Sequence, residues 1–244
     1  MRFDSAFYSK PGGRPTNEDS LTVIRDGARL LALAADGLGG MGGGDIASKD
    51  AVTYLAGSLA GKTVDEDLLC DEIRQENSRI CRMHRDGSRM MTTIAALWTD
   101  GRQTLAANVG DTRIYQFRCG EIVFQSVDHS AAQLSVFSGK ITQAQLRGYP
   151  GRNRLTRALG AEQEVWAELD ELEVRPGDRL LLCTDGFWEL VMEAEMLCWE
   201  ADDSASAWLE RMETLALTRC GPRGDNHSAI AVIVTEESGN AERC

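Results

Sequence analysis

The first quarter of the chain alternates between apolar runs and polar turns in a way that predicts three strands followed by a helix. The strands are expected at residues 2–9, 20–25 and 29–35. After its first residue the third strand, Arg-Leu-Leu-Ala-Leu-Ala-Ala, is apolar throughout, which is typical of a strand buried on both faces. A glycine-rich turn over 37–44 then leads into a helix at about 45–60, where apolar residues recur at helical spacing.

The remainder of the chain predicts a second helix, a run of short strands and further helices. Thr63 and Glu66 have the spacing of a capping box and mark the start of the second helix. The later elements are three or four strands within 91–126, short helices within 130–152, strands at 165–174 and 179–184, helices at about 192–200 and 204–219, and a strand at 229–234. Because the strands within 91–126 are joined by short turns, we expect them to pair antiparallel. This order predicts layered sheets with helices outside them.

Composition excludes several classes of protein. The 244 residues are 43% apolar and 26% charged, and their formal charge of −12 argues against binding to nucleic acid or to anionic membrane. The longest apolar run, residues 30–35, is too short to span a bilayer, and the N-terminus lacks the apolar stretch of a secretory signal. None of the seven cysteines shares a Cys-x-x-Cys spacing, so we expect reduced core thiols in a cytoplasmic protein.

The glycine-rich turn over 37–42 fits the pattern of a dinucleotide-binding loop, Gly-x-Gly-x-x-Gly, between a strand and a helix. Two features argue against that interpretation. Asp36 stands directly before the loop, where a pyrophosphate needs positive potential, and the next predicted element is a helix rather than a second strand. No Gly-Lys-Ser/Thr sequence is present either. We therefore expect the glycines to form a sharp turn beside a metal-binding aspartate.

Four aspartates stand where an apolar strand meets a turn: Asp36, Asp111, Asp185 and Asp225. One such aspartate means little, because aspartate is a common turn residue. Four carboxylates brought together would repel one another strongly unless cations lay between them. Since the candidate ligands are all oxygens, Mg²⁺ or Mn²⁺ fits better than Zn²⁺. A carboxylate cluster that holds two such ions is suited to phosphoester hydrolysis.

Near the N-terminus, Arg14 precedes a pair of acidic residues, Glu18 and Asp19. An isolated arginine is commonly an exposed loop residue. The functional interpretation is that its guanidinium clamps phosphate oxygens, while Glu18 and Asp19 order water bound to the metal. Asn226 is expected to fix the loop of Asp225 by hydrogen bonding.

Eight motifs in order along the chain resemble those of the metal-dependent protein serine/threonine phosphatases of type 2C (the PPM family), in their compact bacterial form. They are Arg14 with NED at 17–19, ADGLGG at 35–40, TTIAAL at 92–97, NVGDTRIY at 108–115, DHS at 128–130, NRLTRALG at 153–160, CTDGFWE at 183–189 and DNHSAIAVIV at 225–234. Each motif is weak by itself, and the series in register is specific.

The resemblance implies an α+β fold, a four-layer α-β-β-α sandwich of two antiparallel sheets flanked by helices. It implies a single domain over 1–244, in which 130–152 form a flap beside the active site. Asp36 would bridge two metal ions, and Gly37 would offer its backbone carbonyl. Asp185 and Asp225 would complete the binuclear Mn²⁺ or Mg²⁺ site.

The resemblance also assigns Asp111, with Asp185, to a third and weaker ion, and Arg14 to the substrate phosphate. A water shared by two cations would attack the phosphorus in line, without a phosphoenzyme. One departure matters for this mechanism. Leu38 stands where animal members carry a histidine suggested as the acid for the leaving group, so that role passes to metal-bound water by default, with His227 as a weaker candidate. Arg113 and Arg157 are expected to pair with carboxylates.

The expected function is dephosphorylation of phosphoserine and phosphothreonine in phosphoproteins by a cytoplasmic, monomeric enzyme. Its partners would be a serine/threonine kinase and the targets of that kinase, including those that control type VI secretion. Neither nucleic acid nor a membrane is expected as a partner. The alternative is a non-catalytic, phosphate-sensing or scaffold member of the same fold. The retained Arg14, Asp36, Asp185 and Asp225 argue against it, because a scaffold has no need of a complete ligand set.

Overall fold

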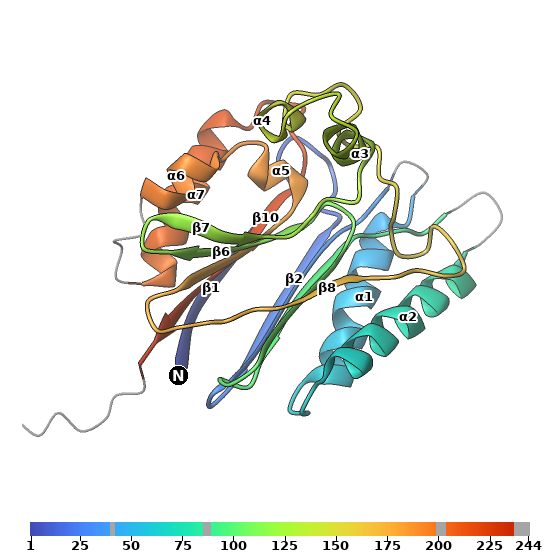
Figure 1. Ribbon diagram of the computed structural model, residues 1–244. Helices are drawn as coiled ribbons and strands as arrows, with labels where there is room; N and C mark the ends of the chain where they lie inside the picture. The colour runs from blue at the N-terminus through green and yellow to red at the C-terminus, as the bar shows by residue number, and fades with distance from the viewer. Residues whose placement is uncertain (40–41, 85–88, 199–203, 237–244) are drawn as a thin grey trace, which may run out of the picture.

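The structure, a computed structural model, describes residues 1–39, 42–84, 89–198 and 204–236 and contains two five-stranded antiparallel sheets. The first sheet has the strand order β1-β10-β9-β6-β7, and the second has the order β2-β3-β4-β5-β8. The strands are β1 (Arg2–Lys10), β2 (Asp19–Asp26), β3 (Arg29–Asp36), β4 (Ile94–Thr99), β5 (Thr104–Val109), β6 (Arg113–Arg118), β7 (Glu121–Gln125), β8 (Glu168–Glu171), β9 (Arg179–Cys183) and β10 (His227–Thr235). Figure 1 shows the sheets packed face to face.

The two faces of β3 explain why its sequence is apolar throughout. Leu31, Leu33 and Ala35 lie in the core between this sheet and its helices. The alternate positions, among them Ala32 and Ala34, lie in the core between the two sheets. Because side chains alternate across a strand, a strand with a core on each side needs apolar residues at every position. The expectation that this strand is buried on both faces is confirmed.

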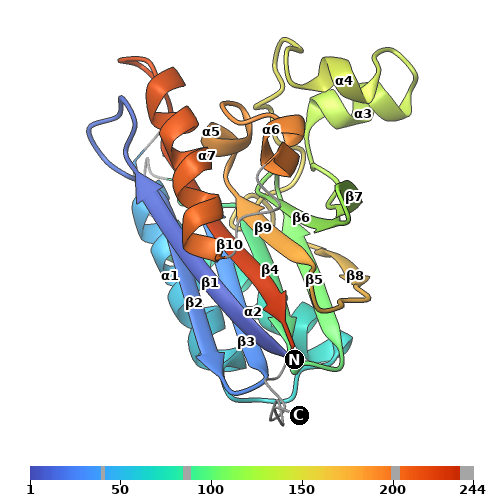
Figure 2. The same cartoon turned by 90° about the vertical axis from the view of Figure 1, so that its left-hand side faces the viewer.

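Helices cover the outer face of each sheet. The helices are α1 (Gly44–Leu59), α2 (Glu66–Met83), α3 (Ala131–Phe137), α4 (Gln143–Leu146), α5 (Asp185–Trp188), α6 (Glu193–Cys198) and α7 (Ala205–Arg219). The first two pack on the β2–β8 sheet, and α7 packs on β1 and β10 of the other, as Figure 2 shows. The predicted four-layer α-β-β-α sandwich is confirmed.

The segment over 130–152 carries α3 and α4 and lies beyond the end of the sheets, at the top of Figure 1. Two arginines tie it to the α5–α6 region. Arg152 pairs with Glu189, and Nη2 of Arg147 donates to Oε1 of Glu193 at 2.6 Å. The segment is therefore anchored to the stretch of chain that begins at Asp185.

Several local expectations differ from the structure. The second helix is capped by Asp65, whose side chain accepts from the backbone N–H of Leu68 at 2.8 Å, and not by a Thr63–Glu66 capping box. An aspartate directly before the first helical residue serves as the N-cap here. The strand expected over 165–174 is shorter, and the one-turn helix α5 was not expected.

The cysteines were expected in the core, and among the six that the structure describes only Cys183 is buried. All six are free thiols. Residues 40 and 41 of the glycine-rich loop, and the expected end of a helix at 199–200, lie outside the described residues. None of the helices within the described ranges has both the length and the apolar character needed to cross a bilayer.

Candidate active site

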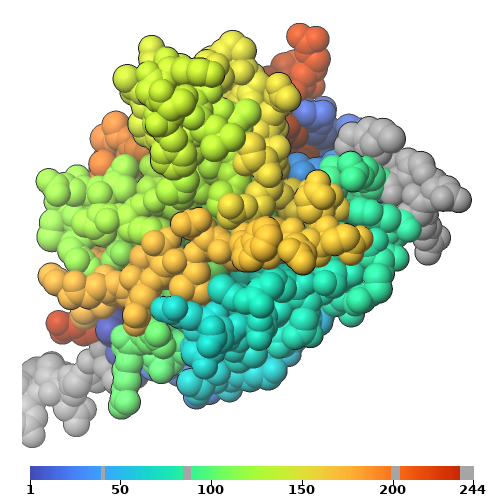
Figure 3. All heavy atoms as spheres, turned by 45° about the vertical axis from the view of Figure 1, so that its right-hand side comes forward, coloured from blue at the N-terminus to red at the C-terminus, as the bar shows by residue number. Residues whose placement is uncertain are grey.

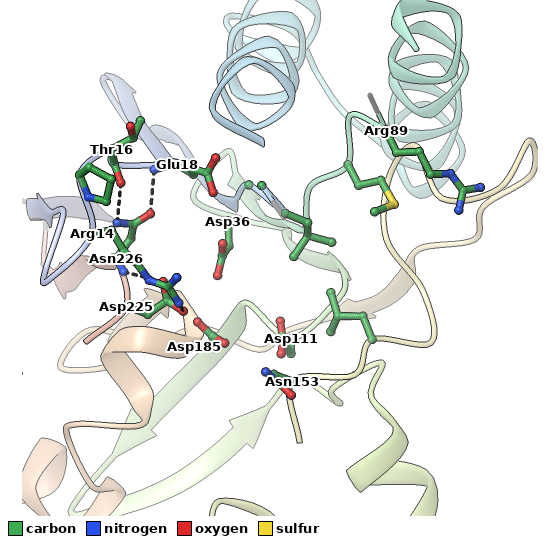
Figure 4. A pocket seen from close by; sticks show the side chains of 16 residues that line it. Arg14, Thr16, Glu18, Asp36, Arg89, Asp111, Asn153, Asp185, Asp225 and Asn226 are labelled. Atoms are coloured by element: carbon green, nitrogen blue, oxygen red, sulfur yellow. Dashed lines mark hydrogen bonds and ion pairs between the residues drawn. The ribbon is translucent and has the colours of Figure 1, made fainter. Parts of the chain in front are cut away.

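One pocket of about 660 Å³ collects the four predicted aspartates. Asp36 is the last residue of β3 in the β2–β8 sheet, and Asp111 lies in the turn between β5 of that sheet and β6 of the other. Asp185 follows β9 and Asp225 precedes β10, so both come from the other sheet. Figure 4 shows the four carboxylates around one space, with Glu18 beside them. The strand ends of two separate sheets therefore converge on this pocket.

Asp36 is fixed by its main chain. Its N–H donates to Oγ1 of Thr93 at 2.9 Å, and its carbonyl accepts from Oγ1 of Thr92 at 2.8 Å and from the N–H of Thr93 at 2.9 Å. Both threonines are fully buried. The buried threonine pair thus holds the backbone of Asp36 and leaves its carboxylate directed into the pocket.

Asp19 lies buried behind the pocket wall and does not line the pocket itself. Its Oδ2 accepts from Oγ1 of Thr184 at 3.0 Å and from Oγ of Ser228 at 2.6 Å. Its Oδ1 is also buried and has no hydrogen-bond partner. A buried acceptor without a partner is costly, and such an atom indicates a place for a water or another donor.

Asn226 links the loop of Asp225 to the loop between β1 and β2. Its Oδ1 accepts from the N–H of Glu18 at 2.8 Å, and its Nδ2 donates to the carbonyls of Pro11 and Thr16, both at 2.9 Å. Its own N–H donates to Oδ1 of Asp225 at 2.9 Å. The role expected of Asn226, fixing the loop of Asp225, agrees with these contacts, and the residue also fixes the loop that carries Arg14.

Arg14 reaches the carboxylate cluster directly. Its Nη2 donates to Oδ2 of Asp225 at 3.0 Å, and about half of each side chain remains exposed. The pocket's other described arginine, Arg89, points away from the carboxylates in Figure 4. Arg14 is therefore in place to meet an anion that enters the pocket.

Two glycines allow the backbone segments around the pocket to approach closely. A Cβ at Gly37 would lie 2.2 Å from the carbonyl oxygen of Gly44, and a Cβ at Gly186 would lie 2.0 Å from the carbonyl oxygen of Asn226. Both contacts are with backbone, which cannot turn aside as a flexible side chain does. These positions accept only a residue without a side chain.

Crowding of carboxylates dominates the electrostatics. Desolvation and the charges of Asp19, Asp185 and Asp111 raise the pKa of Asp36 well above its usual range. Desolvation, followed by the charge of Asp185, raises the pKa of Asp111 in the same way. Desolvation also raises the pKa values of Asp19 and Asp185. The protein thus holds more negative charge here than its own cations neutralise.

The donor set of the pocket fits hard divalent cations. The carboxylate of Asp36 is desolvated and repelled by the charges of Asp19, Asp185 and Asp111, so protons or cations must offset part of this charge. Histidine and cysteine are absent from the described lining, which leaves oxygen as the ligand atom. No group of three acidic, histidine or cysteine side chains within the described ranges is arranged to hold an ion by itself. Ions that retain waters and use one or two carboxylates each are compatible with this arrangement.

Asp111 is held by a buried network beneath the segment over 130–152. The indole Nε1 of Trp188 donates to the carbonyl oxygen of Asp111 at 2.9 Å. The Arg113 guanidinium lies 3.6 Å from the centre of the Trp188 ring and pairs with Asp128 at 2.7 Å. The expected pairing of Arg113 with a carboxylate is confirmed.

Two expectations about histidine and arginine are wrong. His227 is fully buried, its Nδ1 lies 3.2 Å from the hydroxyl of Tyr8, and it lines a different cavity, so it does not reach the carboxylates. Arg157 pairs with no carboxylate among the residues that the structure describes: its Nη1 lies 3.1 Å from Nε2 of His129 and donates to the carbonyl of Trp166 at 2.9 Å. Both side chains are engaged by neighbours from distant parts of the sequence, which local spacing does not reveal.

The structure also assigns positioning roles that the sequence analysis did not reach. They belong to Thr92, Thr93, Thr184, Ser228 and Trp188. The available signal was their position, since each adjoins a predicted aspartate or lies in a motif. Their hydrogen-bond partners come from distant parts of the sequence, so the sequence analysis could not predict the hydrogen bonds themselves.

Comparison with known proteins accounts for this arrangement. Residues 13–221 match the sequence model of a single family, described as Protein phosphatase 2C. The chain belongs to that family. The predicted family, its enzyme class and its two-sheet fold are thereby confirmed.

One curated relative in the family is the serine/threonine protein phosphatase PstP of Mycobacterium tuberculosis, which is 34% identical over 229 residues. The match covers 91% of this chain and 43% of PstP, so the chain spans less than half the length of that relative. A crystal structure of the PstP catalytic domain in complex with two manganese ions matches with a TM-score of 0.82 and 31% identity, covering 96% of this chain and 99% of that one.

A second solved structure is that of PppA, described as a key regulatory component of the type VI secretion system (T6SS) in Pseudomonas aeruginosa. It matches with a TM-score of 0.82 and 30% identity, covering 96% of this chain and 98% of PppA.

Proposed function

We propose that this chain hydrolyses phosphoserine and phosphothreonine in phosphoproteins with the help of Mn²⁺ or Mg²⁺. The observation that carries the proposal is the convergence of four carboxylates and Arg14 on one pocket, in a chain of the protein phosphatase 2C family. The residues over 1–244 act as one domain in this proposal, and 130–152 serve as the flap of the site.

Each residue has a distinct role. Asp36, Asp185 and Asp225, with the carbonyl of Gly37, would hold two ions, and Asp111 with Asp185 would hold a third. When bound, such ions would supply Lewis acidity, which lowers the pKa of water and neutralises phosphoryl charge. Arg14 binds the substrate phosphate, because a guanidinium matches two phosphoryl oxygens at once.

The residues behind the pocket orient water. Thr184 and Ser228 both donate to one oxygen of Asp19, which fixes the carboxylate and leaves its second oxygen as a free acceptor. Glu18, whose pKa is raised by desolvation and by the charges of Asp45 and Asp225, lies at the pocket edge. We assign both acids to accepting hydrogen bonds from water in the pocket. Leu38 has no proton to donate, so the leaving oxygen takes its proton from water.

The test is metal-dependent turnover. We expect hydrolysis of para-nitrophenyl phosphate and of a phosphoserine peptide to stop in EDTA and to return with Mn²⁺ or Mg²⁺. Asp36→Asn and Asp185→Asn should each lower kcat at least about 10²-fold, since the site then loses an ion or misplaces it. Asp26→Asn, at the exposed end of β2, is the matched control and should retain activity.

Thermal unfolding gives a second measurement. Because the crowded carboxylates destabilise the folded pocket, Mn²⁺ should raise the Tm of the wild type, and the rise should shrink in Asp36→Asn. Full activity in EDTA would overturn the proposal. Phosphopeptide binding without turnover under any metal would favour the scaffold alternative.

The setting of the activity is part of the proposal. A serine/threonine kinase and its targets are the partners, and the enzyme acts in the cytoplasm as a monomer, with neither nucleic acid nor membrane as a partner. The likeness to PppA supports a role in control of type VI secretion. A phosphoproteome comparison of a strain with and without active enzyme would test this role, and unchanged phosphorylation of secretion components would exclude it.

A further inference from the structure

A second cavity adjoins the pocket of the carboxylates. It measures about 530 Å³, and we call it the side groove. Leu38, Met91, Asn153 and Leu155 line both the side groove and the carboxylate pocket, so the two spaces share a wall. A phosphorylated residue bound at the carboxylates would therefore have neighbouring residues of its own chain beside the groove.

The side groove divides into two chemically different parts. Its inner wall, next to the carboxylate pocket, carries the apolar side chains of Leu38, Met91 and Leu155. Its lining also includes Glu162, Glu164 and the exposed indole of Trp166. Figure 3 shows this part of the chain, in yellow to gold, on the surface beside the teal residues of α2. An apolar entrance and an acidic edge are thus combined in one cavity.

The net charge of the residues that line the side groove is negative. Both Glu162 and Glu164 are exposed, and the structure gives neither carboxylate an ion pair with any described residue. Arg157 is the cation of the described lining, and its Nη1 is engaged with His129 and with the carbonyl of Trp166. A carbonyl and an imidazole do not neutralise the Arg157 guanidinium, so the described lining sets two carboxylates against one cation and keeps a net negative charge.

We propose that the side groove binds a lysine or arginine side chain of the substrate protein, close in sequence to the phosphorylated residue. This inference rests on the proposed phosphatase function. Lysine and arginine have an apolar stem and a cationic head, the same division that the groove shows. The stem would pack on Leu38, Met91 and Leu155, and the head would reach Glu162 and Glu164. The exposed face of Trp166 adds a surface on which a cation binds favourably.

The experiment compares phosphoserine peptides that differ only in flanking charge. One set carries arginines on the N-terminal or the C-terminal side of the phosphoserine, and the matched set carries glutamates at the same positions. With Mn²⁺ present, we expect the wild type to prefer the basic set by about tenfold in kcat/KM. The preference should weaken as salt is raised, because the pairs are exposed.

Charge removal then locates the preference. E162Q/E164Q should lower kcat/KM for the basic peptides about 3- to 10-fold, mainly through KM, and should leave para-nitrophenyl phosphate turnover unchanged. E121Q/E210Q changes the net charge equally and is the control. Glu121 on β7 and Glu210 on α7 do not line the side groove, so this variant should retain the preference for basic peptides. Trp166→Ala should also lower kcat/KM for the basic peptides, because it removes the exposed aromatic surface of the groove.

Three results would overturn the inference: no preference in the wild type, equal losses for both peptide sets in E162Q/E164Q, or the same loss in E121Q/E210Q. In each case, metal-dependent turnover of para-nitrophenyl phosphate would leave the proposed function standing. Absence of any turnover with Mn²⁺ or Mg²⁺ would instead reject the proposed function, and the inference with it.

Discussion

Arg14 and Asp225 form an ion pair at the mouth of a pocket that otherwise contains an excess of carboxylates. An exposed pair of this kind contributes little to stability, because water screens both charges. Its value lies in position. The structure shows one guanidinium nitrogen on Asp225, and the planar fork retains further donors for an anion.

Replacing Arg14 with alanine tests this role. We expect Arg14→Ala to lower kcat/KM for phosphopeptides about 10²-fold, with a higher KM and a lower kcat, since the guanidinium binds phosphate in the ground state and stabilises charge in the transition state. Arg14→Lys should recover only part of the loss, because an ammonium lacks the fork. Arg89→Ala, in the same pocket but directed away, is the control, and an equal loss there would deny Arg14 a specific role.

Leu38 permits a second test at the level of one residue. Its side chain lines the pocket, so Leu38→His would place an acid there. We expect this change to help phosphopeptide turnover more than aryl-phosphate turnover, because a serine alkoxide needs protonation and a phenolate does not. The gain should fade above a pH of about 6.5, where an unperturbed histidine loses its proton. Measuring kcat/KM for both substrates over a range of pH decides the matter, and equal changes would point to another proton donor.

At the scale of strands and helices, the ends of elements were the informative part of the sequence. The continuous apolar run of β3 predicted burial on both faces, and the four aspartates predicted as ligands all line the pocket. The one-turn helix α5 was missed because four residues give no periodicity. The contact of Asp19 with Thr184 and Ser228 joins residues more than 160 positions apart, so no local pattern could specify it.

Gly186 in α5 tests how tightly these elements are joined. Because an added Cβ would lie 2.0 Å from the carbonyl of Asn226, Gly186→Ala should push the loop of Asp225 away. We expect a lower Tm and a loss of activity larger than the loss of stability would cause. The control is Gly57→Ala in α1, where a Cβ meets nothing within 4 Å. That change should stabilise the helix by about 0.5–1 kcal/mol with full activity. Equal behaviour of the two variants would contradict the argument.

At the scale of the whole molecule, the pocket exists only when the two sheets are packed together. Asp36 comes from one sheet, Asp185 and Asp225 come from the other, and Asp111 comes from the turn that connects the two sheets. The pattern of strands predicted the elements within each sheet, whereas their docking came from the resemblance to a family. The relative position of the two sheets depends on the small alanines between them, such as Ala32 and Ala34. No single segment of the sequence predicts that position.

Global stability should depend on pH through Glu76, a fully buried residue of α2. Desolvation, followed by the charge of Asp50, raises its pKa from 4.5 to about 8, against the opposing charge of Arg79, whose Nε lies 3.0 Å from Oε2 of Glu76. The folded state then keeps a proton that the unfolded state has lost, so the free energy of unfolding falls as pH rises from 4.5 towards 8. Glu76→Gln avoids ionisation and should raise the Tm, little at pH 5 and most at pH 8 and above.

Thermal scans of wild type and Glu76→Gln across that range measure the effect. The exposed Glu121→Gln is the control and should leave the curve unchanged. A constant difference between wild type and Glu76→Gln at every pH would show that Glu76 does not titrate in this range.

The position of β10 between β1 and β9 has a consequence for biosynthesis. The first strand has its sheet partner at 227–235, so it emerges from the ribosome long before that partner exists. At translation rates of about 5–20 residues per second, the interval is roughly 10 to 40 s. Throughout it, the apolar residues of β1 remain available to chaperones and to other nascent chains. The last strand to be made inserts between two waiting neighbours and brings Asp225 to the pocket, so a chain that stalls before it has neither a closed sheet nor a complete set of carboxylates.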